Sequence, residues 1–89
     1  MYLAKTFTLE DSNLHTVLTF NLFIKEGKPI LVESALESNG SRVDNTYDGK
    51  EDILERLWKL DLLCDGEIEV RGVIRDLRQC LIDHLYGHE

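Results

Sequence analysis

The residues best suited to metal chemistry lie near the C-terminus. Cys80, His84 and His88 recur every four residues, so an unbroken helix would bring a thiolate and two imidazoles toward one side. Such a set could supply three ligands to zinc. Cys80 and His84 also lie close to the apolar stripe of the same segment, and Gly87 is a typical helix end, which favours packing roles and a frayed His88. We therefore expect no metal centre and no cofactor.

Nucleophilic catalysis finds little support in the sequence. Ser12 and His15 are near neighbours, but no Gly-x-Ser-x-Gly elbow surrounds the serine, and the glycines stand too far apart to form a phosphate-binding loop. A nucleophile needs a base that a third group orients, and this pattern is missing. The sequence favours a non-enzymatic role, while an active site assembled from distant residues would escape this reasoning.

One basic stripe stands out in an acidic chain. Arg71, Arg75 and Arg78 share one line of an expected helix and could bind a carboxylate or phosphate through their planar guanidinium groups. The alternative is that their stems cover an edge of the core, with Glu67 placed four residues before Arg71 to pair with it.

A second stripe is apolar. Leu54, Trp58 and Leu62 are spaced by four residues, and Trp58 and Leu62 point away from Ile53 at about 100° per residue. The segment is therefore apolar on two sides. Either it is buried between the sheet and the second helix, or its Trp58 side contacts another molecule, since Trp is favoured at the centres of interfaces.

These side chains need strands and helices to position them. Alternating apolar residues predict a strand over 15–24, and Leu3, Phe7 and Leu9 are expected on one face of a preceding strand. Pro29 opens a third strand that runs to residue 37. Asn39-Gly40 is typical of a type I′ turn before a weaker strand over 41–47.

Helical spacing governs the second half. Asp48, with Glu51 three residues later, indicates a helix over about 49–63, and Asp65-Gly66 ends it. A second helix is predicted over about 70–86, with Gly72 leaving residues 67–71 open between strand and helix. The fold class is α+β: an antiparallel meander of three to four strands (residues 2–47), followed by two helices packed on one face, in a single domain over residues 1–89.

Composition limits the possible partners. The net charge of −7 opposes direct binding to nucleic acid, whose phosphates require a basic face. The longest nearly apolar run, 17–24, is too short for a membrane span, and two cysteines with no leader favour the cytoplasm.

Three functional hypotheses follow. The first is a non-enzymatic cytoplasmic protein-interaction or regulatory domain, homodimeric, which uses the Trp58 side and one sheet edge. The second is an acidic inhibitor or neutralising partner of a basic protein, in which the acidic surface imitates nucleic acid. The third is a small metal-binding protein that uses Cys64, Cys80, His84 and His88.

Overall fold

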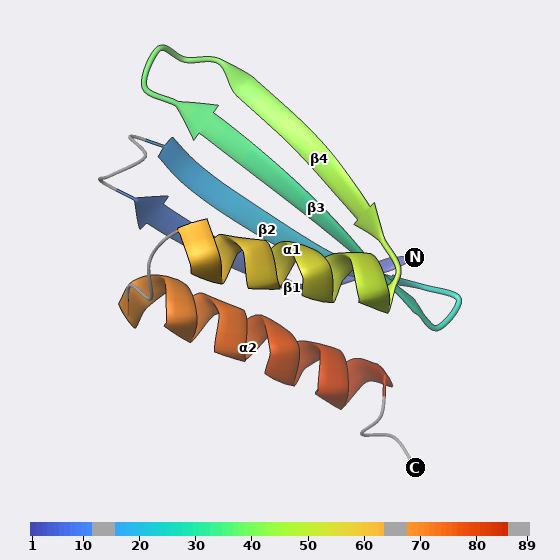
Figure 1. Ribbon diagram of the computed structural model, residues 1–89. Coiled ribbons are helices and arrows are strands. Elements are labelled where there is room, and N and C mark those ends of the chain that lie inside the picture. The colour runs from blue at the N-terminus through green and yellow to red at the C-terminus, as the bar shows by residue number, and fades with distance from the viewer. Residues whose placement is uncertain (12–15, 64–67, 86–89) are drawn as a thin grey trace.

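The computed structural model shows a four-stranded antiparallel sheet with two helices on one of its faces (Figure 1). It describes residues 1–11, 16–63 and 68–85. The strands are β1 (Tyr2–Asp11), β2 (Thr16–Lys25), β3 (Lys28–Glu37) and β4 (Arg42–Asp48), and the helices are α1 (Lys50–Leu63) and α2 (Ile68–Leu85). Each strand pairs with its neighbour in the chain, in the order β1-β2-β3-β4. The predicted α+β meander followed by two helices is confirmed.

The core lies between the sheet and the two helices. Alternate residues of β2 are buried on the helix side, and Phe20 and Leu22 are fully enclosed. Each such side chain contributes about 1.5–3 kcal/mol relative to an exposed position. The helices contribute their apolar stripes to the same core, namely Ile53, Leu57 and Leu60 from α1 and Val70, Ile74, Leu77 and Leu81 from α2.

The type I′ turn lies in a different hairpin from the expected one. Glu26 and Gly27 both have positive φ (53° and 78°), as a type I′ turn between β2 and β3 requires. At Asn39-Gly40 only the glycine has positive φ, at 89°, so the type I′ prediction there is wrong. The Gly40 N–H donates to the Glu37 carbonyl at 3.0 Å, and Glu37 closes the loop with Ser41. Three residues lie between the closing pair, and such loops end in a left-handed glycine.

A β-bulge alters the start of β1. Leu3 pairs with Phe23, but Lys5 pairs with Leu22, so Ala4 is an extra residue. Leu3 consequently lies on the sheet face away from the helices and is 51% exposed. The expectation that Leu3 shares a face with Phe7 is wrong, because the inserted residue reverses the alternation.

The helix boundaries follow from local backbone geometry. Gly49 has a φ of 97°, and its carbonyl accepts the Ile53 N–H at 3.2 Å, so α1 begins at Lys50, and the expected cap residue Asp48 is instead the last residue of β4. The described part of the uncertain segment 67–71 is helical, since α2 begins at Ile68, and Glu67 lies outside the described residues. Gly72 lies inside α2.

Candidate functional site

The Trp58 side of α1 is open to solvent. Trp58 is 57% exposed and Leu62 61% exposed, whereas Leu54 is half-buried and packs against the core. The helix uses its opposite stripe to cover the sheet. Of the two alternatives for Trp58, burial between the sheet and α2 is therefore wrong.

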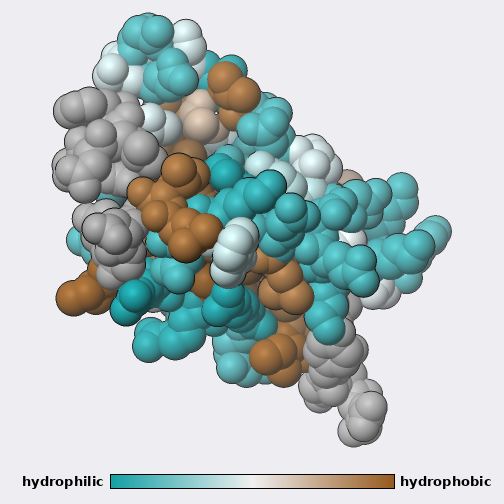
Figure 2. All heavy atoms as spheres, viewed as in Figure 1, coloured by the Kyte–Doolittle hydropathy of each residue, from teal (hydrophilic) through white to brown (hydrophobic). Residues whose placement is uncertain are grey.

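The three arginines of α2 line a groove on the outer surface. This groove has a volume of about 600 Å³, and its walls combine guanidinium groups with apolar side chains. Its lining includes Asp61 from α1 and Ile68, Arg71, Arg75, Arg78 and Ile82 from α2. Figure 2 views the molecule from the helical side, where brown apolar patches interrupt the hydrophilic surface. The groove can contact a ligand through both charge and apolar area.

Trp58 and the arginine stripe belong to neighbouring surfaces. The Arg71 Nε lies 3.7 Å from Asp61 Oδ1 and so links the two helices, and Trp58 is one turn before Asp61 on α1. Residues three apart in a helix share a side, so Trp58 stands beside the groove. We call Trp58, Leu62 and the groove-lining side chains of α2 the helical surface.

Among the described residues, which do not include Glu67, the arginines have only long contacts with acidic groups. The side chains of Arg71 and Arg75 are 67% and 82% exposed, and their contacts to Asp61 and Asp76 are 3.7 Å long, beyond hydrogen-bonding distance. Arg78 makes no ion pair with any described residue. Exposed ion pairs of this kind contribute little to stability. The arginines therefore remain accessible to an external anion.

The proposed metal ligands are only partly covered by the described residues. Cys80 is buried as a free thiol, and burial raises its pKa, with Asp83 adding to the effect and Lys5 opposing it. His84 lies with its Nδ1 3.5 Å from the Tyr2 hydroxyl. His88 and Cys64 lie outside the described residues, as do Ser12 and His15. Within the described ranges no three potential ligands come together.

A buried ion pair escaped sequence analysis. Glu33 is 3% exposed and accepts two hydrogen bonds from Arg56, Nε to Oε1 at 2.8 Å and Nη2 to Oε2 at 2.9 Å. The Arg56 guanidinium also lies 5.9 Å from the ring centroid of Tyr47. The available signal was an acidic residue between Leu31 and Ala35 on the buried side of β3, a position that requires a cationic partner. The pair joins α1, which carries Arg56, to β3, which carries Glu33, and it uses both carboxylate oxygens.

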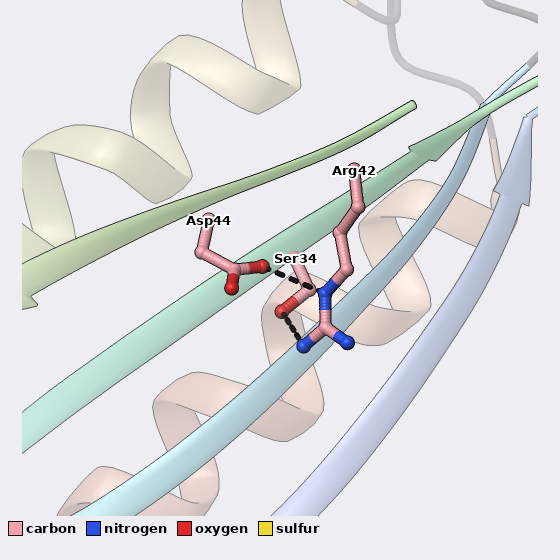
Figure 3. A network of polar contacts seen from close by, with 3 residues as sticks. All are labelled: Ser34, Arg42 and Asp44. Atoms are coloured by element: carbon pink, nitrogen blue, oxygen red, sulfur yellow. Dashed lines mark hydrogen bonds and ion pairs between the residues drawn. The ribbon is translucent and has the colours of Figure 1, made fainter. Parts of the chain in front are cut away.

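The other face of the sheet carries a second polar network (Figure 3). Arg42 donates from Nε to Asp44 Oδ1 at 3.0 Å and from Nη2 to Ser34 Oγ at 3.4 Å. Hydrogen bonding with Ser34 and then with Arg42 lowers the pKa of Asp44. Arg42 and Ser34 also line a shallow depression of about 320 Å³ on this face. The network organises the exposed side of β3 and β4.

Comparisons with protein-family models, curated proteins and solved structures gave no significant match. Among the described residues, neither helix combines the length and apolar character needed to cross a membrane.

Proposed function

We propose that this chain is a non-enzymatic protein-interaction domain of the cytoplasm, and that its helical surface binds an acidic, partly apolar segment of another protein. One observation carries the proposal. An exposed Trp58 lies beside a groove in which three exposed arginines are flanked by Ile68 at one end and Ile82 at the other. Aromatic and arginine side chains are the types most enriched among residues that dominate binding energy.

Charge selects the kind of partner. The chain has a net charge of −7, yet its arginine stripe is concentrated along one helix. A partner with carboxylates at helical spacing would neutralise the stripe, and apolar residues on either side of those carboxylates would cover Ile68 and Ile82. Asp61 at one end of the groove would accept an N–H from such a segment. A short acidic segment can stay within the stripe, whereas a longer nucleic acid would extend onto the surrounding acidic surface.

Self-association through this surface is the competing possibility. The sequence favours a homodimer through the Trp58 side, but the exposed edge of β4 offers a second surface for self-association. Dimerisation at β4 would leave the helical surface available to a different protein. The buried free thiol of Cys80 fits the reducing cytoplasm.

The test compares variants of the helical surface. Proteins captured by the immobilised chain are identified and purified, and their affinities are measured by calorimetric titration. We expect Trp58→Glu to weaken binding at least about tenfold. We expect the double variant Arg75→Lys, Arg78→Lys to lose about 1–3 kcal/mol with little change in melting temperature, because lysine keeps the charge but lacks the planar fork.

A charge reversal elsewhere provides the control. Lys28→Glu, at the exposed first residue of β3, is compared with Arg75→Glu, because both change the net charge equally but Lys28 lies outside the groove. If the two charge reversals lower the affinity for the partner equally, the effect comes from overall charge, and this would contradict a binding site on α2. If Trp58→Glu instead converts a dimer to a monomer, the surface serves self-association.

A further inference from the structure

β4 is an edge strand whose side chains are almost entirely uncovered. Six of its seven residues are exposed, and only Tyr47 is half-buried. It pairs with β3 through seven uninterrupted residue pairs, and it stands last in the strand order. Within the described residues its outward edge has no strand partner. A regular, unpaired edge of this kind is a template for another strand.

The opposite edge of the sheet is less suitable. β1 contains the bulge at Ala4 and the charged Lys5, both of which discourage pairing at an edge. β4 contains no lysine, proline or bulge, and its charged residues, Arg42, Asp44 and Asp48, are of both signs and can pair with one another. The contrast between the edges directs any strand addition to β4.

The sequence of β4 is complementary to itself. In an antiparallel pair of two β4 strands related by a two-fold axis at Asn45, Arg42 faces Asp48 of the second copy, Val43 faces Tyr47, and Asp44 faces Thr46. The first pair is an ion pair, the second covers Val43, which is 48% exposed, and the third places a hydroxyl donor against a carboxylate. By symmetry each of these contacts occurs twice.

Neighbouring registers are less favourable. Facing residues must lie on the same side of the sheet, so the register can shift only in steps that keep one residue opposite its own copy. An axis at Asp44 would place two copies of that carboxylate face to face. An axis at Thr46 would place Asp44 against Asp48. Like charges directly opposite are destabilising, so the axis at Asn45 is selected.

We infer that two copies of this chain dimerise by antiparallel pairing of β4 with β4, with Asn45 on the two-fold axis, to form a continuous eight-stranded sheet. The axis is perpendicular to the sheet, so all four helices lie on one side. The dimer therefore presents two helical surfaces in the same direction, which suits a partner with two binding segments. The interface is small, and we expect a dissociation constant on the order of 10 µM.

Sedimentation velocity on the full chain tests the inference, over about 1 to 300 µM to bracket that constant. We expect Asn45→Lys to weaken the dimer at least about tenfold, because two lysines would meet on the axis. Arg42→Asp and Asp48→Arg should each weaken it as well. The double variant Arg42→Asp, Asp48→Arg should recover most of the loss caused by either single variant, although it does not restore the hydrogen bonds of Arg42 with Asp44 and Ser34. This recovery identifies contact between copies, because the two positions lie about 20 Å apart within one strand.

Three outcomes would overturn the pairing. The first is a monomer throughout the concentration range. The second is a double variant that does not recover although each single variant weakens the dimer. The third is a dimer that persists in Asn45→Lys but is lost in Trp58→Glu. We expect every variant to fold, because these positions are exposed in the monomer, and circular dichroism of each variant checks this. This result can be separated from the proposed function. If an Asn45→Lys monomer still binds the partner, the helical surface binds independently of dimerisation.

Discussion

At the residue scale, the Glu33–Arg56 pair is the most constrained polar contact in the described structure. It is bidentate, and the carboxylate is almost wholly buried, whereas the arginine side chain is 21% exposed. Such a pair contributes little compared with well-packed apolar residues, but the loss of one partner leaves a charge in a poorly solvated place. The pair therefore serves to select one orientation of α1 over β3 and β4.

We expect Glu33→Gln to lower the free energy of unfolding by about 2 kcal/mol, below the usual range for a buried pair because Arg56 retains some solvent contact. Urea denaturation of the wild type and variant measures the change. The double variant Glu33→Leu, Arg56→Leu provides the control and should recover at least half of the loss, since no buried charge remains. A Glu33→Gln variant as stable as the wild type would show that the pair is not important for stability.

At the element scale, α2 tolerates a glycine that its sequence alone would not favour. Gly72 lies in the helix interior, where a Cβ would meet no heavy atom within 4 Å. Its φ is outside the left-handed region, unlike that of Gly49 at 97°. Neither packing nor backbone geometry requires glycine at position 72.

Gly72→Ala should therefore stabilise the protein by about 0.5–1 kcal/mol, because alanine loses less conformational entropy in a helix. Thermal unfolding of matched variants measures the effect. Gly49→Ala is the contrasting variant and should destabilise, because alanine resists the left-handed conformation between β4 and α1. Destabilisation by Gly72→Ala would mean that α2 departs from regular helical geometry at this position.

At the scale of the whole molecule, the strands differ in how well their backbone is protected from local opening. β2 and β3 each pair on both sides and carry fully buried residues, whereas β4 has one neighbour and mostly exposed side chains. Local opening requires the loss of few contacts at an edge and of many at the centre. The stable part of the fold is thus the central hairpin with the helices packed on it.

Hydrogen exchange followed by mass spectrometry should find the slowest amides in β2 and β3 and faster ones in β4. If β4 pairs with a second copy, its protection should increase with protein concentration, and Asn45→Lys should abolish that increase. Peptides from β2 serve as the internal control, because their protection should not depend on concentration. Faster exchange in β2 than in β4 would contradict the described arrangement of strands.

The sequence alone determined the identity and order of most elements, because strand alternation, helical spacing and turn residues act over short distances. The alternation in β2 and the stripe that contains Ile53, Leu57 and Leu60 were recognisable from spacing. The Trp58 side could be recognised as a second apolar stripe, but its exposure could not be known before the packing of α2.

Only the tertiary structure determined which residues from distant parts of the sequence contact one another. Glu33 and Arg56 are 23 residues apart, and nothing local to either indicates the other. The bulge at Ala4 arises from the register of β1 with β2. The contact of Asp61 with Arg71 depends on how the two helices are oriented on the sheet. The same holds for β4, which has an ordinary strand sequence but becomes an unpaired edge only because the meander ends there. Long-range pairing is set by the summed burial of the whole core, which no short window of sequence contains.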